Sequence, residues 1–310
     1  MRLIFLGTPE FAVPTLEGAV AAGHEIAAVL TQPDRPKGRG HGLAAPPVKE
    51  AALRLGLAVH QPERIRTPEM AGFLRELRPE AMVLAGYGKI IPQSIIDIPP
   101  HGILNVHASL LPNYRGAAPI QWAIANGETR TGVTTMRIDA GLDTGDILLQ
   151  AETGIGPEET AIELGARLAR MGADLLVETL ARLASGSLVG VPQDSSRASF
   201  APVLRKEDGR IDWTRTAAEI YNRIRGFLPW PGSTTRFRGQ QLQVWRARVA
   251  GEAAGLPGSL HAAKGRLFAT CGRASLELLE LQVEGKRRMS AADFLNGYQV
   301  GENEMLEMSQ

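Results

Sequence analysis

One segment, residues 102–149, constrains this 310-residue chain more than any other. It opens with residues 102–107, an apolar run with the length and composition of a short buried strand. Asn105 and His107 stand two positions apart in this run, so in a strand both side chains point to the same face. Ligands gather at the carboxyl ends of parallel strands, and the pair therefore indicates a functional site at that end of a sheet.

The rest of the segment predicts a loop, a helix, two strands and a tight turn. Residues 109–112, Ser-Leu-Leu-Pro, suit the loop, and residues 116–126 suit a helix with proline in its first turn. Residues 133–138 alternate like a strand, and a return strand starts at Ile147. The turn between them, residues 141–146, reads Gly-Leu-Asp-Thr-Gly-Asp and consists of residue types that tolerate positive φ.

The side chains of Asn105, His107 and Asp143 suit acyl transfer. An asparagine amide and a protonated histidine both donate hydrogen bonds, so Asn105 and His107 together could hold the oxyanion of a tetrahedral intermediate. The carboxylate of Asp143 would favour the imidazolium form and could accept a proton from an attacking amine, directly or through water. Taken singly, the histidine is more commonly structural and the aspartate more commonly a turn former. No second His or Cys stands at ligand spacing, so a metal site is not expected.

Four motifs in this order resemble the signature of the folate-dependent formyltransferases. They are Asn105-x-His107, residues 109–112, Tyr-Arg-Gly-Ala-Ala-Pro-Ile-Gln at residues 114–121, and the turn at residues 141–146. The resemblance implies 10-formyltetrahydrofolate as formyl donor and the α-amino group of methionyl-tRNA as acceptor. It covers nearly the whole chain, so it also implies an aminoacylated initiator tRNA as partner.

The resemblance assigns roles to individual residues. The catalytic set is Asn105, His107 and Asp143, acting in direct transfer without a covalent enzyme intermediate, since no activated Ser or Cys is evident. The folate contacts are Ser109, Leu110, Leu111, Pro112, Ile91, Gly88, Asp139 and Gly141. For Ile91 and Gly88 an ordinary strand-to-helix turn with a core isoleucine remains an open alternative.

The first part of the chain predicts an α/β fold. Strands at residues 2–6 and 25–30 flank a helix that reaches about residue 22, but no Gly-x-Gly-x-x-Gly follows the first strand. We therefore expect a Rossmann-like, mostly parallel sheet with helices on both faces and no NAD. Residues 157–184 predict a long helix whose leucines recur at three- and four-residue steps, with Glu158 and Glu159 at its positive N-terminal end.

The last part of the chain predicts a second domain. Several short strand patterns between residues 233 and 281, with little helix, indicate a small OB-like β-barrel. We place the formyltransferase catalytic domain at residues 1–189, a linker at 190–204 and a tRNA-binding barrel at 205–310. The acidic tail from residue 302 is expected to fray.

Basic residues mark the expected tRNA contacts. The long loop at residues 31–47 alternates cations with glycines, which suits successive phosphates, although a solvated loop has the same composition. The resemblance places such an insertion against the tRNA acceptor end and makes Arg39 the strongest single candidate. The complete set is Arg35, Lys37, Arg39, Lys206, Arg246, Lys286 and Arg287. Val203 stands where the family commonly has lysine, which puts the contact expected from that lysine in doubt.

Composition restricts the class of protein. One cysteine, Cys271, excludes an intrachain disulfide, and no apolar run has the length of a membrane span. We expect a cytoplasmic monomer. The net charge is only +1, although residues 1–202 carry 18 basic and 21 acidic side chains and residues 203–310 carry 16 and 12.

Three alternatives remain at this point. A formyltransferase acting on a small amine, such as an amino-sugar nucleotide or glycinamide ribonucleotide, would share the core motif but should lack the basic loop and the barrel. A nucleotide-dependent oxidoreductase lacks support without the glycine fingerprint. A non-catalytic RNA-binding protein would not need the Asn-His-Asp set.

Overall fold

The computed structural model of this protein describes residues 1–37, 42–252, 255–301 and 304–307. The chain divides into two compact units, each assembled from three segments. The first unit is Met1–Gly116, Arg130–Gly154 and Gly165–Ala201, and the second is Ala117–Thr129, Ile155–Leu164 and Pro202–Gln310. Within the described ranges, no helix has the length and apolar character needed to cross a membrane.

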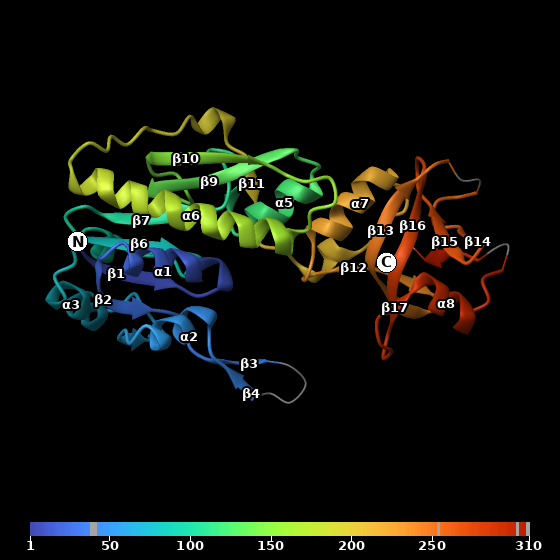
Figure 1. The fold of residues 1–310 in the computed structure, drawn as a ribbon, viewed down its shortest axis with the longest axis horizontal. Helices are drawn as coiled ribbons and strands as arrows, with labels where there is room; N and C mark the ends of the chain where they lie inside the picture. The colour runs from blue at the N-terminus through green and yellow to red at the C-terminus, as the bar shows by residue number, and fades with distance from the viewer. Residues whose placement is uncertain (38–41, 253–254, 302–303, 308–310) are drawn as a thin grey trace. The chain divides into compact units, whose positions relative to one another are not determined.

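A seven-stranded sheet organises the first unit, in the order β10-β9-β7-β6-β1-β2-β5. Figure 1 labels the strands from β10 to β2. The strands are β1 (Arg2–Gly7), β2 (Glu25–Leu30), β5 (Val59–His60), β6 (Ala81–Ala85), β7 (Ile103–His107), β9 (Arg130–Arg137) and β10 (Ile147–Gly154). The strands from β5 to β7 run parallel, whereas β9 pairs antiparallel with β7 and β10 with β9. Five consecutive residues of β1 are buried, which is the pattern of a strand covered on both faces.

Helices cover both faces of this sheet. They are the 3-10 helix η1 (Glu10–Ala12), α1 (Val13–Ala21), α2 (Pro47–Arg54), α3 (Pro68–Glu76), α4 (Gln93–Ile96) and α6 (Ala161–Ala184), whose first turn belongs to the second unit. The first unit also contains the 3-10 helix η2 (Ser195–Arg197), none of whose residues is buried. Leu74 of α3 and Ile95 of α4 pack in one cluster with Ile103 of β7. On the opposite face, Gly172 of α6 lies against Val106 of β7. The predicted Rossmann-like sheet is confirmed.

The long helix α6 begins four residues later than the sequence pattern predicted. The backbone N–H of Thr160 donates to the Glu163 carboxylate at 2.9 Å, and the Thr160 hydroxyl accepts from the Glu163 N–H at 3.4 Å. This reciprocal capping satisfies amides at the start of the helix, so the helix begins at Ala161. Glu158 and Glu159, predicted at the positive N-terminal end of this helix, therefore lie directly before its first turn and not within it.

The second unit contains a curved antiparallel sheet in the order β14-β15-β16-β13-β12-β18, with β17 paired to β16. Its strands are β12 (Ser233–Phe237), β13 (Gln240–Ala250), β14 (Leu260–Ala263), β15 (Arg266–Thr270), β16 (Ser275–Val283), β17 (Met289–Ser290) and β18 (Leu306–Glu307). Its helices are α5 (Pro119–Ala125), η3 (Lys206–Gly209), α7 (Ala217–Gly226) and α8 (Ala291–Gly297). A bridge between Ser259 and Met305 joins the two ends of the sheet, which confirms the predicted small barrel.

Large apolar side chains fill this barrel. Trp213, Phe237 and Phe294 belong to one cluster and are at most 2% exposed. The Trp213 indole donates to the Thr235 hydroxyl at 3.1 Å, so the one polar group of this buried ring has a partner. Cys271 is buried in the same cluster, and burial raises the pKa of its thiol to about 12. Cys271 is therefore a packed core residue.

Two segments predicted as irregular contain paired strands. Inside the loop of residues 31–47, β3 (Arg35–Lys37) pairs antiparallel with β4 (Gly42–Ala44). The Asp34 carboxylate, directly before β3, accepts from Lys49 at 2.7 Å and from Gln61 at 2.7 Å, and these bonds lower its pKa. In the tail expected to fray, β18 pairs with β12.

A carboxylate on the barrel is held by two arginines. Glu277 of β16 is 5% exposed and accepts from Arg266 at 2.6 Å and from Arg248 at 2.5 Å. The hydrogen bonds from Arg266 and then from Arg248 lower the Glu277 pKa to about 2. Because the folded pKa lies below the ordinary value of 4.5, this group stabilises the fold above pH 4.5. That contribution is lost as pH falls from 4.5 toward 2.

We expect Glu277→Gln to lower the free energy of unfolding by about 2 kcal/mol at pH 7, a value that allows for the half-exposed arginines. The difference from the wild type should shrink as pH falls below 4.5, because the wild-type carboxyl then becomes protonated. Urea unfolding at pH 7 and pH 3 measures both. Glu284→Gln, at an exposed position just after the same strand, is the control and should change little. A deficit that is equal at the two pH values would contradict the assignment.

Candidate active site

The register of β7 places the two central residues on one face of the sheet. Across the β7–β9 pairing, His107 lies opposite Thr134 and Asn105 lies opposite Met136. Val106, between them, faces α6 on the other side of the sheet. The prediction that Asn105 and His107 project together is therefore confirmed, and both side chains lie on the face away from α6.

His107 is 6% exposed, and both of its ring nitrogens have a neighbour. Nε2 lies 3.0 Å from the carbonyl oxygen of Tyr114. A carbonyl only accepts, so Nε2 carries a proton and donates. Nδ1 lies 3.7 Å from Oδ2 of Asp143, which is too long for a hydrogen bond but within range of an ion pair. Nδ1, which faces the carboxylate, is thus the ring nitrogen that remains available to a bound substrate.

Asp143 lies in a loop with unusual backbone geometry. Its φ is +52°, in the left-handed region that few residues other than glycine, asparagine and aspartate adopt. Its Oδ2 accepts a hydrogen bond from the backbone N–H of Gly116 at 2.8 Å. Asp139 shapes the same loop, because its carboxylate accepts from the Gly141 N–H at 3.0 Å and from the Thr144 hydroxyl at 2.7 Å. The loop therefore presents Asp143 in one defined orientation.

The two glycines of this loop are required for a reason other than the one predicted. The described positive-φ residues include Asp143 but neither Gly141 nor Gly145. A Cβ at Gly141 would collide with the Thr144 hydroxyl, and a Cβ at Gly145 would collide with the carbonyl oxygen of Arg137. Close approach of neighbouring atoms, and not positive φ, excludes side chains at both positions.

Asn105 differs from His107 in having an available amide. It is 5% exposed. Within residues 1–37, 42–252, 255–301 and 304–307, its side-chain amide has no hydrogen-bond partner. A nearly buried amide of this kind retains two donors for a bound group.

The Ser109 to Pro112 segment is held from beneath by β9. The Thr134 hydroxyl donates to the Ser109 carbonyl at 2.7 Å and accepts from the Leu111 N–H at 3.1 Å. The Ser109 hydroxyl donates to the Asn113 carbonyl at 2.6 Å. Leu111 is buried, whereas Leu110 and Pro112 are half-buried. These bonds fix the backbone of the predicted folate-binding loop.

The second predicted folate segment follows β6. Gly88 has φ +76°, and the preceding Tyr87 carbonyl accepts from Thr8 at 3.1 Å and from Gln32 at 3.0 Å. Ile91 belongs to the buried core cluster, whereas its neighbour Ile90 is 72% exposed. The side chain of Ile91 thus lies in the core, which is the alternative that the sequence left open. Any ligand contact at this segment therefore depends largely on backbone groups.

The predicted tRNA-binding residues are distributed over both units. Arg35 and Lys37 lie on β3, and Arg39 lies outside the described residues. In the second unit Lys206 lies on η3, Lys286 and Arg287 lie in the turn after β16, and Arg246 lies on β13. Arg246 forms an ion pair with Glu280 at 3.3 Å. Arg35, Lys206, Lys286 and Arg287 are exposed and form no ion pair with the residues that the structure describes.

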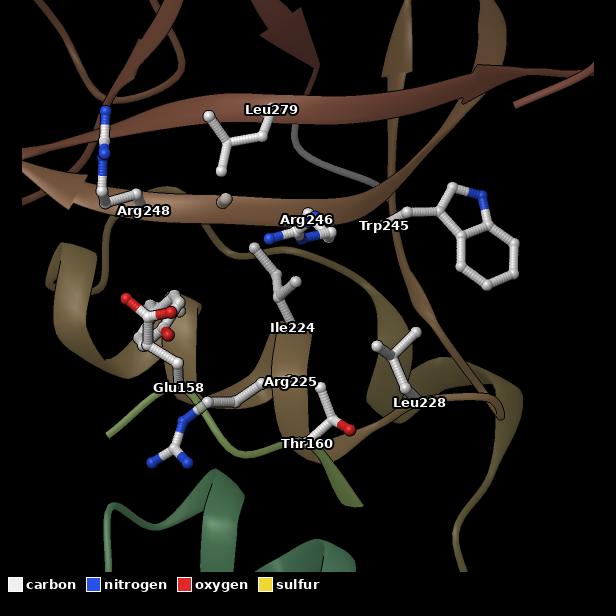
Figure 2. A pocket seen from close by; sticks show the side chains of 11 residues that line it. Glu158, Thr160, Ile224, Arg225, Leu228, Trp245, Arg246, Arg248 and Leu279 are labelled. Atoms are coloured by element: carbon white, nitrogen blue, oxygen red, sulfur yellow. The ribbon is translucent and has the colours of Figure 1, made fainter. Parts of the chain in front are cut away.

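A pocket of about 170 Å³ lies in the second unit between α7 and β13. Its apolar wall includes Ile224 and Leu228, and Arg246 projects toward it from β13 (Figure 2). Arg225 also lines it, but its guanidinium donates to the carbonyls of Gly156 at 3.1 Å and Glu159 at 2.9 Å. That arginine therefore holds the loop before α6. The pocket contains none of the residues of the Asn-His-Asp set.

Sequence reasoning missed two residues of the site. Arg115 is 4% exposed, and its guanidinium donates to Oε1 of Gln193 at 2.7 Å. The Gln193 amide in turn donates to the carbonyls of Asp143 at 2.9 Å and Gly145 at 2.7 Å. Arg115 was part of a recognised motif, but no spacing rule connects it with a glutamine 78 positions later. The described residues contain no group of three or more His, Cys, Asp or Glu side chains arranged to hold a metal.

The fold and this site define a class of enzyme. The model of the formyl transferase family matches residues 1–180, and that of the formyl transferase C-terminal domain matches residues 203–299. The chain belongs to the formyl transferase family. It is 63% identical to the methionyl-tRNA formyltransferase of Solibacter usitatus, over 99% of this chain and 98% of that protein. It is 59% identical to the methionyl-tRNA formyltransferase of Koribacter versatilis, over 96% of each chain.

Solved structures share the fold at low sequence identity. The N-formyltransferase from Helicobacter canadensis, in complex with folinic acid and dTDP-3-aminofucose, has a TM-score of 0.68 at 19% identity and covers 90% of this chain and 98% of its own. HypX from Aquifex aeolicus, in complex with tetrahydrofolic acid, has a TM-score of 0.64 at 17% identity and covers 95% of this chain and 47% of its own. These likenesses concern the fold alone.

We expect Gly145→Ala to lower the rate of formyl transfer by at least about 10-fold, because the added methyl group would displace the Asp143 loop from the Arg137 carbonyl. Gly72→Ala is the matched control. Gly72 lies in α3 with no neighbouring atom within 4 Å of an added Cβ, so alanine should preserve activity and raise stability by about 0.5 to 1 kcal/mol. Transfer assays and thermal unfolding of both variants measure these effects. Wild-type activity in Gly145→Ala would show that the loop tolerates displacement.

Proposed function

We propose that this chain transfers the formyl group of 10-formyltetrahydrofolate to the α-amino group of methionyl-tRNA, giving N-formylmethionyl-tRNA for translation initiation. The observation that supports the chemistry is the nearly buried His107, with Asp143 3.7 Å from Nδ1 and Asn105 on the same face of β7. The acceptor follows from relatives named methionyl-tRNA formyltransferase that are 55% to 63% identical over at least 96% of this chain.

The folate is a substrate in this scheme, and the reaction calls for neither a metal nor NAD. We propose that the donor is held by Ser109, Leu110, Leu111, Pro112, Ile91, Gly88, Asp139 and Gly141. The anchoring of residues 109–112 on Thr134 supports this, because a rigid loop loses little conformational entropy when it binds. The name of HypX in complex with tetrahydrofolic acid is consistent with a folate on this fold.

The first step forms the bond between the amine nitrogen and the formyl carbon. The amine nitrogen attacks the formyl carbon, the C–N bond forms, and the formyl oxygen takes the negative charge of a tetrahedral intermediate. The Asn105 amide donates to this oxygen, assisted by Nδ1–H of His107. The availability of the Asn105 amide and its position beside His107 support this role.

The second step expels the folate. The proton lost by the amine passes to the Asp143 carboxylate, directly or through water. The intermediate collapses, the bond between carbon and N10 breaks, and His107 gives a proton to the leaving nitrogen. The bond from Nε2 to the Tyr114 carbonyl supports Nδ1 as the atom that makes this transfer. Asp143 thus takes up one proton and its neighbour His107 releases one.

We propose that the tRNA is bound through Arg35, Lys37 and Arg39 of the loop at residues 31–47 and through Lys206, Arg246, Lys286 and Arg287. In this scheme residues 1–189 are the catalytic domain, 190–204 the linker and 205–310 the tRNA-binding domain. The exposed, unpaired cations among these residues support the contacts. We place the protein in the cytoplasm as a monomer.

The deciding experiment offers the enzyme 10-formyltetrahydrofolate with methionyl-tRNA, free methionine or an amino-sugar nucleotide. Formylation of methionyl-tRNA alone is the expected result. Formylation of the amino sugar alone would replace the proposed acceptor but keep the chemistry. No transfer to any acceptor would reject the function.

We expect Asn105→Ala and His107→Ala each to lower kcat by roughly 100- to 1,000-fold, the usual loss when one oxyanion donor is removed. Both variants should remain folded by circular dichroism, because the small apolar side chain of alanine fits a buried strand at either position. His101→Ala, before the same strand, serves as the control and should keep wild-type turnover. Near-normal turnover by either site variant would remove it from the mechanism.

We expect Arg35→Ala and Lys286→Ala to raise the KM for methionyl-tRNA and to leave the KM for the folate unchanged. Each lost phosphate contact should also reduce the slope of log affinity against log salt by about 1. Arg182→Ala is the control, because Arg182 already forms an ion pair with Glu178 on α6. An unchanged salt slope in both variants would place the tRNA elsewhere.

A further inference from the structure

We propose that Gln193 and Arg115 are positioning residues, which hold the carboxylate of Asp143 in its working orientation beside His107. This inference rests on the proposed formyl transfer and adds two residues that do not themselves contact the reacting groups. All of the residues involved belong to the first unit.

The carboxylate of Asp143 needs an anchor other than His107. Its Oδ2 is 3.7 Å from Nδ1 of His107, a separation at which the histidine exerts attraction but no directional control. The backbone of Asp143 is in the left-handed region, with φ +52°, where a non-glycine residue persists only if its surroundings hold it. The position of this carboxylate is therefore set by the contacts behind the loop.

Gln193 supplies those contacts with both ends of its amide. Its Nε2 donates to the Asp143 carbonyl at 2.9 Å and to the Gly145 carbonyl at 2.7 Å. Its Oε1 accepts from Nε of Arg115 at 3.1 Å and from Nη2 at 2.7 Å. Because two carbonyls require a donor and two guanidinium N–H groups require an acceptor, only an amide fits here without an unsatisfied group.

Arg115 connects this amide to the carboxylate itself. The residue after it, Gly116, donates its N–H to Oδ2 of Asp143 at 2.8 Å. Arg115 and Gly116 therefore hold Asp143 at two points, through its side chain directly and through its backbone by way of Gln193. The backbone N–H of Arg115 donates to the Ser199 carbonyl at 2.9 Å, and Arg115 and Gly116 pair with β11 (Phe200–Ala201) as strand β8 (Arg115–Gly116).

The chemistry of Arg115 also favours a positioning role over simple packing. Its guanidinium is almost fully desolvated at 4% exposure, and within the described ranges it has no carboxylate partner. Its side-chain hydrogen bonds go to Gln193 and, at 3.4 Å, to the Ser195 hydroxyl. Burying a cation with neutral partners is costly, so a neutral side chain would suffice if only packing were needed.

The test compares Gln193→Ala and Gln193→Glu with the wild type. Alanine removes every hydrogen bond of the Gln193 side chain. Glutamate keeps both acceptor bonds to Arg115 but places a carboxylate against the Asp143 and Gly145 carbonyls. Because each variant loses the two bonds to the loop, each should lower kcat by about 10- to 100-fold. The KM values for methionyl-tRNA and 10-formyltetrahydrofolate should change less than about 3-fold, since the loop and not the binding surface is disturbed. Gln93→Ala, an exposed glutamine on α4, is the matched control and should behave as wild type.

A double-mutant cycle separates positioning from a general structural defect. If Gln193 acts through Asp143, adding Gln193→Ala to Asp143→Asn should cost less than about 3-fold more in single-turnover rate. Full additivity of the two losses, or wild-type kcat in Gln193→Glu, would overturn the inference. An inactive wild type in the same assay would instead reject the proposed function, so the two failures are distinguishable.

Discussion

The antiparallel pairing of β9 with β7 is the interaction on which the site depends. It sets Thr134 opposite His107, and the Thr134 hydroxyl then fixes the backbone of the Ser109–Pro112 loop from below. A shift of one residue would turn Asn105 and His107 toward α6 and bury them against Val133 and its neighbours. The register of two strands thus decides whether the polar pair faces ligand or core.

The loop that follows β9 shows a different kind of constraint. Its carboxylate is presented by an aspartate in a conformation that most residues avoid, and two glycines make room for the atoms that hold it there. Several hydrogen bonds from distant parts of the first unit oppose the strain. Such a loop is costly to form but rigid once formed, and rigidity is what proton transfer over a short distance requires.

The sequence allowed the sheet, the barrel and the shared face of Asn105 and His107 to be predicted, because each depends on local periodicity. The family resemblance supplied Asp143, since nothing local distinguishes it from a turn residue. Gln193 was not predictable, because its partners lie 48 or more positions away and no periodicity links them. The start of α6 was predicted four residues too early, because Glu158 and Glu159 are residue types that suit a helix N-terminus. The Thr160–Glu163 cap instead starts the helix at Ala161. Long-range hydrogen bonds and competing caps account for the differences.

Each unit is assembled from segments that alternate along the chain, so no single cut in the sequence separates the two units. Helix α5 and the residue before it, Ala118, precede two of the three segments of the first unit in sequence. Ala118 and Ala125 nevertheless pack with Leu204 and Phe227 of the second unit, and Trp122 meets Phe227 edge to face. A fragment ending near residue 201 would carry this apolar helix without its cover. Neither half is an exchangeable module, so recombination between relatives at the apparent boundary would have to preserve packing contributed from both sides of the junction.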